Sequence, residues 1–158
     1  MDFTKYSDIV YQVIGAALSV YNTQGRGLLE PIYNESLSLE LMDLGIDNQA
    51  ECEVDCYYKH HKLQKKYRVD ILVGTDICVE LKSVATILPE HRSQLFNYLR
   101  LTRLPVGLLI NFGSKSLQGE RYGYDIENNT CYRLDKDMQP IHSEYNWPKI
   151  YKEIVENL

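Results

Sequence analysis

The sequence lacks the features that mark membrane proteins, secreted proteins and cysteine-bound metal sites. No apolar run approaches the roughly 18 residues that span a bilayer, and residues 1–5 do not have the layout of a signal peptide. The 4 cysteines include no C-x-x-C pair and match no ferredoxin-type spacing, so neither a zinc ribbon nor an iron–sulfur cluster is indicated. We therefore expect a cytoplasmic protein with reduced thiols and no membrane partner.

Basic residues are also in the minority, which argues against a protein that coats DNA without specificity. The 158 residues include 17 Lys/Arg and 22 Asp/Glu, for a net charge of −5. Residues 59–103, however, hold nine Lys/Arg and four Asp/Glu, so this stretch is +5 and the remainder is −10. A local basic excess is what a polyanionic substrate requires, although a solvated hairpin tip over residues 59–66 explains its lysines equally well.

The order of predicted elements indicates an α/β protein. Helices are predicted over residues 5–24, 30–44 and 89–102, and strands over residues 50–58, 68–73, 77–82 and 105–112. The last strand follows a helical crossover, so it should return parallel to its neighbour in a mixed sheet of about four strands flanked by helices. We expect a core over residues 1–113. A C-terminal extension over residues 114–158 should pack on the same domain, with short edge strands within 119–134 and a helix over 147–157.

The two strands at residues 68–73 and 77–82 carry the main chemical signal. Folding of this hairpin about Thr75 places Asp70 opposite Glu80, with Lys82 one pleat along on the same face. Two carboxylates held this close repel each other unless a cation or a shared proton relieves them. A hard divalent cation takes oxygen ligands, and a nearby lysine can stabilise a phosphate or position water. A solvated ladder of salt bridges is the alternative interpretation.

Five short motifs occur in a fixed order along the chain. They are G-x-x-E-x-x-Y at 27–33, Y-R-V-D at 67–70, V-E-L-K at 79–82, H-x-x-Q-L-x-x-Y-L at 91–99 and V-G-L-L-I-N-F at 106–112. Together they resemble the GxxExxY family of the PD-(D/E)xK nuclease superfamily over residues 8–113. Val69 stands where the superfamily has proline, and Tyr21 stands where members of the family often have histidine.

The resemblance implies a restriction-endonuclease-like three-layer core and a metal-dependent nuclease. Asp70 and Glu80 would then bind Mg²⁺ or Mn²⁺, and Glu30 would approach the metal or its waters. Lys82 would assist attack of water on a phosphodiester bond. These four residues are therefore the expected catalytic set, and the three carboxylates are the expected metal ligands.

The resemblance also implies a nucleic-acid substrate, with DNA favoured over RNA. Gln94 and Tyr98 lie one helical turn apart on one face and, together with Arg68, would contact that substrate. Ordinary packing of the helix on the sheet explains Gln94 and Tyr98 equally well. A homodimer is one way in which such a nuclease could cut both strands. The alternative function is a catalytically silent nuclease-fold module that binds nucleic acid or a protein partner. A third interpretation keeps the fold but places the function in a larger complex, with residues 114–158 as the docking element.

Overall fold

The computed structural model describes residues 1–148, which form three helices and seven strands. The helices are α1 (Ser7–Gln24), α2 (Glu30–Asp43) and α3 (Pro89–Thr102), with a 3₁₀ turn, η1 (Thr4–Tyr6), before α1. The strands are β1 (Asn48–Tyr58), β2 (His61–Val73), β3 (Ile77–Lys82), β4 (Val106–Asn111), β5 (Gln118–Asp125), β6 (Thr130–Leu134) and β7 (Pro140–Ile141). The helix predicted over 147–157 falls almost wholly outside the described residues. Within them, no helix has the length and apolar character of a membrane span.

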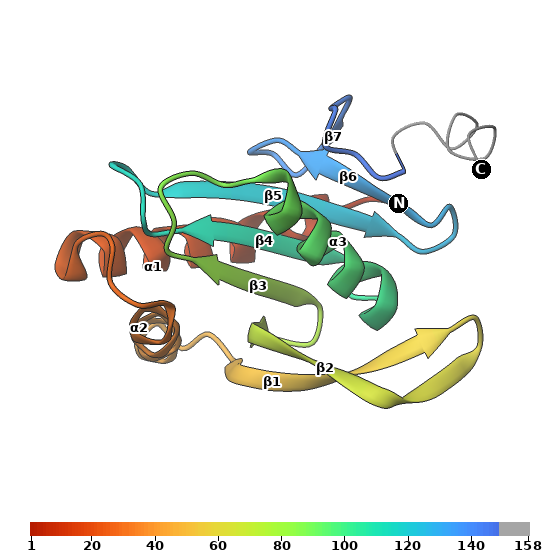
Figure 1. Ribbon diagram of the computed structural model, residues 1–158, viewed down its shortest axis with the longest axis horizontal. Helices are drawn as coiled ribbons and strands as arrows, with labels where there is room; N and C mark the ends of the chain where they lie inside the picture. Colours follow the sequence, from red (N-terminus) through yellow and green to blue (C-terminus); the bar gives the residue numbers. More distant parts are fainter. Residues whose placement is uncertain (149–158) are drawn as a thin grey trace.

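All seven strands belong to one sheet, whose spatial order is the sequence order β1 to β7 (Figure 1). Only β3 and β4 run parallel, as predicted from the helical crossover between them; all other neighbours are antiparallel. The mixed sheet flanked by helices is thus confirmed.

The prediction of about four strands was wrong, because β5, β6 and β7 continue the sheet beyond β4. Strand β5 was expected at an edge but lies between β4 and β6. Its charged residues and two glycines hide the apolar alternation that marks a strand. Glu120 in β5 is nevertheless buried, which residue type alone does not predict.

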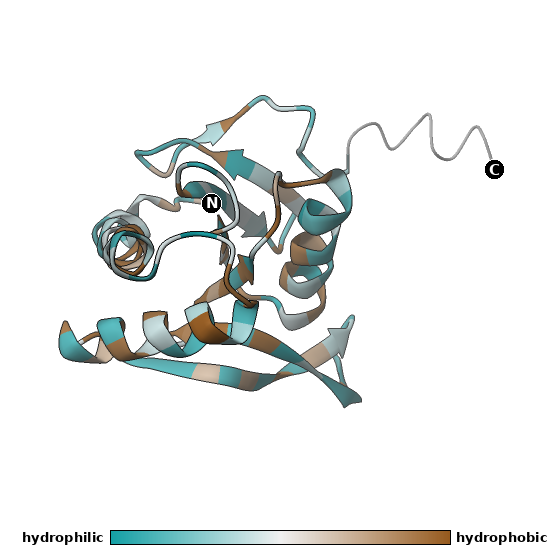
Figure 2. Cartoon of the chain, turned by 60° about the vertical axis from the view of Figure 1, so that its left-hand side comes forward, coloured by the Kyte–Doolittle hydropathy of each residue, from teal (hydrophilic) through white to brown (hydrophobic). Residues whose placement is uncertain are grey.

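The helices cover both faces of the sheet and create two hydrophobic cores. Helices α1 and α2 cover one face, where Val13, Leu37 and Val79 lie in the larger core, and α3 covers the other, where Leu95, Leu99 and Leu109 lie in the second core. Hydrophobic and hydrophilic residues share each helix (Figure 2), as expected for helices with one face on a sheet. The predicted three layers are therefore present.

Candidate active site

The β2–β3 hairpin has the register that folding about Thr75 predicts. Ile71 pairs with Val79 and Leu72 with Cys78, so the same register places Asp70 opposite Glu80. On the other side of β3, Glu80 pairs with Leu109 of β4, which lies in the core beneath α3. The two carboxylates therefore lie in one row of the sheet, on the face that α3 covers.

Glu80 is a buried carboxylate that is only partly compensated. The residue is 4% exposed, and its Oε1 atom has no hydrogen-bond partner within residues 1–148. The charge of Lys82 and a backbone hydrogen bond from Asp70 favour its ionised form but do not offset its burial. Burial raises the pKa of Glu80 to about 8, and the negative charge of Asp70 adds to this effect. A buried carboxyl group with a strongly raised pKa and an oxygen that lacks a hydrogen bond is more typical of a functional site than of a structural ion pair.

Asp70 lies opposite Glu80 on the neighbouring strand and accepts one backbone hydrogen bond. The Leu81 N–H donates to its Oδ2 at 2.8 Å. Burial raises the pKa of Asp70 despite this hydrogen bond, and the charge of Glu30 raises it further. Neither Asp70 nor Glu80 forms a salt bridge within residues 1–148.

Lys82 joins the strand face to helix α3. Its Nζ donates a hydrogen bond to Gln94 Oε1 at 2.9 Å, and Gln94 Nε2 donates to the Tyr98 hydroxyl at 3.2 Å. The Tyr98 ring packs edge-on against Tyr67 of β2, with centroids 5.1 Å apart. The structure thus brings Lys82, Gln94 and Tyr98 together, and holds the ammonium group toward the helix rather than against a carboxylate.

The loop between α1 and α2 is held by the tyrosine of the GxxExxY motif. The Tyr33 hydroxyl donates to the Gly25 carbonyl at 2.6 Å and accepts from the Leu28 N–H at 3.0 Å. Its ring stacks on Phe112, just after β4, with centroids 4.3 Å apart. Gly27 has φ +80°, a conformation that favours glycine. The first and last residues of the motif therefore shape and anchor this loop.

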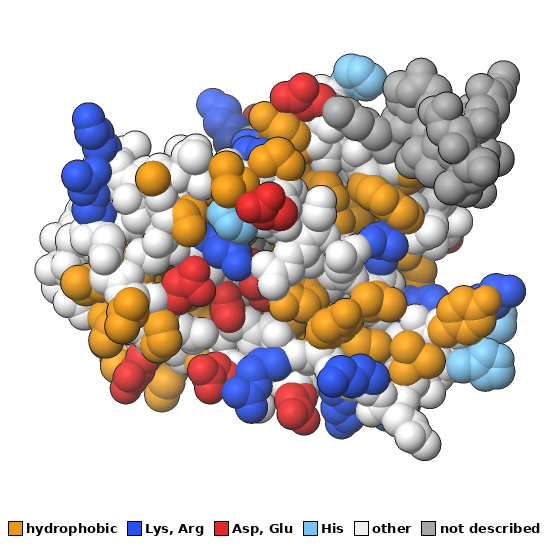
Figure 3. All heavy atoms as spheres, viewed as in Figure 1, with side chains coloured by type: hydrophobic (Ala, Val, Ile, Leu, Met, Phe, Trp, Pro, Cys, Tyr) orange, Lys and Arg blue, Asp and Glu red, His pale blue; other side chains and the backbone are white. Residues whose placement is uncertain are grey.

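The anchored loop delivers Glu30 to the site. Glu30 is the first residue of α2, where a carboxylate is favoured by the helix dipole. The loop is tied to the strand that carries Lys82, because the next residue, Ser83, donates through its hydroxyl to the Leu28 carbonyl at 2.5 Å. The charge of Glu30 raises the pKa of both Asp70 and Glu80, so the three carboxylates form one electrostatic unit. Acidic and basic side chains lie next to each other near the middle of this face (Figure 3).

The donor set fits a metal ion that keeps part of its water shell. No three His, Cys, Asp or Glu side chains in residues 1–148 are grouped closely enough to hold a metal by themselves. Asp70 and Glu80 provide two carboxylates, and the Glu80 Oε1 atom has no other partner. Mg²⁺ usually binds through one or two carboxylates and retains several waters. These two residues therefore suit direct ligation, and Glu30 suits contact through a water.

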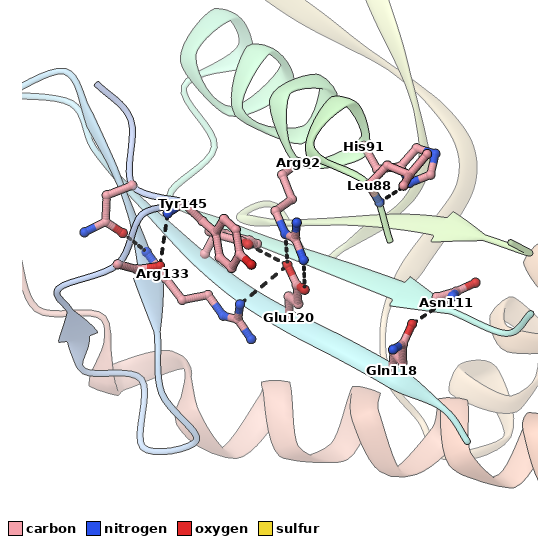
Figure 4. Close-up of polar contacts among 11 residues, drawn as sticks. Leu88, His91, Arg92, Asn111, Gln118, Glu120, Arg133 and Tyr145 are labelled. Atoms are coloured by element: carbon pink, nitrogen blue, oxygen red, sulfur yellow. Dashed lines mark hydrogen bonds and ion pairs between the residues drawn. The ribbon is translucent and has the colours of Figure 1, made fainter. Parts of the chain in front are cut away.

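Three residues of the motif region have other surroundings. Arg68 is exposed and pairs with Glu51 at 3.7 Å, and within residues 1–148 it shares no salt bridge with the other predicted site residues. The Tyr21 hydroxyl donates to the Ser114 carbonyl at 2.8 Å, which ties α1 to the loop after β4. His91 accepts the Leu88 N–H through Nδ1 at 2.9 Å and so caps helix α3 (Figure 4).

Asn111 is a buried residue whose role the sequence reasoning missed. Its Oδ1 accepts from the Val84 and Gly113 N–H groups, and its Nδ2 donates to the Val84 carbonyl and to Gln118 Oε1. A Cβ atom on Gly113 would meet the Val84 backbone at 2.3 Å, so glycine is required there. Asn111 therefore fixes the segment that follows Lys82, and the Asn-Phe pair that ends the last motif was the signal that could have revealed it.

A second polar cluster, also missed, lies beneath the N-terminal half of α3. Arg92 donates two hydrogen bonds of 2.8 Å to the Glu120 carboxylate and stacks on Tyr145, with its Cζ 3.9 Å from the ring centroid. Arg133 of β6 lies 3.6 Å from the same carboxylate (Figure 4). Arg92 and Glu120 are far apart in the chain, so no local pattern pointed to this pair.

Comparisons with known proteins identify a superfamily for this chain. A family model described as the PD-(D/E)XK nuclease superfamily matches residues 7–122, and no curated protein matches. Among solved structures, "Crystal structure of SSO0001" is 20% identical, with a TM-score of 0.48 over 74% of this chain and 58% of that one. This chain thus spans little more than half the length of that protein. Because the family model matches well over half of its residues, the chain belongs to the PD-(D/E)XK nuclease superfamily.

Proposed function

We propose that this protein is a metal-dependent nuclease of the GxxExxY type that hydrolyses phosphodiester bonds in nucleic acid. The observation that carries the proposal is Glu80, a buried carboxylate opposite Asp70 with an oxygen that has no partner. Burial of two neighbouring carboxylates without a cation is unfavourable. A bound divalent cation removes that cost. The superfamily, whose members are usually nucleases, supplies the reaction class.

In the proposed site, Asp70 and Glu80 would hold Mg²⁺ or Mn²⁺, and Glu30 would add a third negative charge beside the ion. The ion, when bound, lowers the pKa of water and neutralises charge on the phosphate. Lys82 has its own role, because its ammonium group can stabilise the negative charge that develops during attack on phosphorus. Gln94 keeps that group in place through the 2.9 Å hydrogen bond.

The proposal is tested by metal titration and cleavage assays on the same variants. Isothermal titration of Mn²⁺ should show binding to the wild type and none to Asp70→Asn or Glu80→Gln. Both variants should lose cleavage of labelled DNA and RNA substrates by roughly 10³-fold or more. Glu53→Gln is the matched control, because Glu53 is an exposed carboxylate on neighbouring strand β1.

Two outcomes would contradict the proposal. Cleavage that persists in Asp70→Asn or Glu80→Gln would show that these carboxylates are not the reaction centre. A wild-type protein that binds nucleic acid in EDTA, with the salt dependence of phosphate contacts, but cleaves none with Mg²⁺ or Mn²⁺, would instead be the silent binding module.

A further inference from the structure

A second surface lies at the far end of helix α3, away from Lys82. Here the tip of the β1–β2 hairpin, the C-terminal end of α3 and the turn between β5 and β6 enclose a groove of about 420 Å³. We name it the tyrosine–arginine groove, after the residues that dominate its lining: Tyr57, Tyr58, Lys59, Arg100, Arg103 and Tyr124. At this end of the hairpin, Figure 3 shows orange side chains, the class that includes tyrosine, next to Lys, Arg and His.

The groove presents aromatic rings to solvent beside positive charges. The Tyr58 side chain is 59% exposed. The Lys59 Nζ atom lies 5.4 Å from the Tyr58 ring centroid, and the Arg103 Cζ atom lies 5.6 Å from the centroid of Tyr57. Aromatic faces combined with arginine and lysine are the elements on which unpaired bases stack.

The positive charges of the groove are not neutralised by nearby acids. Elsewhere on the hairpin, Lys62 and Lys66 pair with Asp55. By contrast, Lys59, Arg100 and Arg103 form no salt bridge within residues 1–148. Lys59 is exposed, whereas both arginines are half-buried: Arg103 donates to the Lys59 carbonyl, and Arg100 packs on Trp147 with its Cζ 4.0 Å from the ring centroid. The groove therefore carries positive charge that no acid within residues 1–148 pairs with, which suits a phosphate backbone.

The groove and the candidate active site lie toward opposite ends of α3. Between them, Gln94 of α3 contacts Lys82 of β3, and Tyr98 contacts Tyr67 of β2. Just after the helix ends, Arg103 donates to the carbonyl of Lys59, in the turn between β1 and β2, at 2.5 Å. The nine steps from Gln94 to Arg103 correspond to roughly 14 Å along the helix axis. That distance corresponds to about four nucleotides of a stacked strand.

We propose that the tyrosine–arginine groove binds a single-stranded segment of nucleic acid next to the cleavage point. Duplex bases are already stacked on each other, so only unpaired bases can lie on Tyr57 and Tyr58. The inference rests on the proposed nuclease function and names its substrate class: nucleic acid with a single-stranded flank, such as an overhang or a junction.

The test measures binding in EDTA, where no turnover occurs, by fluorescence anisotropy with labelled dT and rU 12-mers and a blunt duplex. Tyr58→Ala should weaken single-strand binding by at least about 5-fold, whereas Tyr58→Phe should retain it. Tyr11→Ala is the matched control, because Tyr11 is 78% exposed on α1, away from the groove. Duplex binding should change less than about 2-fold in all three variants.

Two results would overturn the groove assignment. One is a wild-type protein that prefers the blunt duplex. The other is equal behaviour of Tyr58→Ala and Tyr11→Ala, which a groove that docks a protein partner would produce. If binding depends on Tyr58 but the wild type cleaves nothing with Mn²⁺, the groove stands and only the nuclease proposal fails. If Asp70→Asn abolishes cleavage but Tyr58→Ala binds normally, the nuclease stands and the groove fails.

Discussion

Glu80 and Glu120 lie in the same row of the sheet, separated by Leu109 of β4, yet their surroundings are opposite. Glu120 is met by Arg92, Arg133 and the Tyr122 hydroxyl. Burial favours its neutral form, but hydrogen bonds led by that from Arg92 leave the pKa of Glu120 below its usual value. The pKa of Glu80, which has no such partners, is raised to about 8.

The contrast shows how one layer of packing can support both stability and reactivity. Glu120 has two arginines against its carboxylate, whereas Glu80 has only the more distant charge of Lys82, which forms no salt bridge with it within residues 1–148. Helix α3 connects the two regions, because Arg92 reaches Glu120 and Gln94, two residues later, reaches Lys82. The first contact fixes the helix, and the fixed helix holds the lysine.

The largest expected effect is on cleavage and concerns the region around Glu80, where Lys82 lies. Lys82→Met should reduce cleavage by roughly 100-fold or more, because it removes a positive charge from the reacting phosphate. The free energy of unfolding should change by less than about 1 kcal/mol, since the only hydrogen bond lost is that to Gln94. Single-turnover cleavage and urea unfolding measure the two effects. A large loss of stability with intact cleavage would show that Lys82 has a structural role, like the cluster around Glu120, and no role in the reaction.

The cluster around Glu120 should respond in the reverse way, with a large change in stability. Arg92→Met leaves the buried Glu120 carboxylate short of its main partner and should lower the free energy of unfolding by roughly 3 kcal/mol. The double variant Arg92→Met/Glu120→Leu should recover part of this loss, because both charges are gone. Urea unfolding measures both, with exposed Lys115→Met as the control. A single variant as stable as the control would mean that the pair contributes little.

Stability should depend on pH in opposite directions at the two glutamates. The folded-state pKa of Glu80 is raised from 4.5 to about 8, so its contribution turns unfavourable as pH rises through that interval, where the unfolded chain ionises first. The folded-state pKa of Glu120 is lowered, so its contribution is present above the unfolded value and is lost as pH falls through the folded one.

Metal-free protein in EDTA tests the Glu80 contribution between pH 5 and 9. Relative to Glu80→Gln, the wild type should lose roughly 2–4 kcal/mol of unfolding free energy across this range. Urea unfolding at each pH gives the slope. Parallel slopes for the two proteins would mean that Glu80 titrates normally in the fold.

The smallest effect concerns the loop that carries Glu30. Tyr33→Phe removes the hydroxyl that bonds to Gly25 and Leu28 and should cost about 1 kcal/mol of stability. Cleavage should fall several-fold, because the loop then holds Glu30 less firmly. Thermal unfolding and cleavage rates check this, with the exposed Tyr11→Phe as the control. Identical stability and cleavage of the two phenylalanine variants would show that the Tyr33 hydroxyl does not support the site.

Much of this architecture could be predicted from sequence because it depends on local periodicity. The helices, most strands through residue 112, the parallel β3–β4 pair and the register that places Asp70 opposite Glu80 follow from alternation, turn residues and connection length. Strand β2 is the exception: it begins at His61 and not at residue 68, because its exposed, lysine-rich first half lacks the apolar alternation of a strand. Strand β5 was expected at an edge, within the short alternating segments of residues 119–134, and the burial of its Glu120 could not be predicted from residue type. The partner that permits its burial, Arg92, lies on another element, and a single sequence gives no sign of such a contact.

The same limit applied within the motifs. Tyr33 and Asn111 both lie in segments that were recognised, yet their roles depend on contacts with backbone groups brought close by the fold. The Tyr33 hydroxyl bonds a loop at Gly25 and Leu28, and the Asn111 amide bonds Val84. Spacing marked these positions, but only the three-dimensional arrangement shows that they hold the loops on which the proposed chemistry depends.

The ends of the seven-stranded sheet have a consequence for aggregation. Long exposed strands invite pairing with a second chain. Strand β1 resists this, because it carries three acidic side chains, has a positive φ of 49° at Glu51 and shifts register between Asp55 and Tyr57. At the other end of the described sheet, β7 is only two residues long and begins with Pro140, which has no N–H to donate. Both described edges of this wide, mostly antiparallel sheet therefore disfavour the addition of a strand from a second chain.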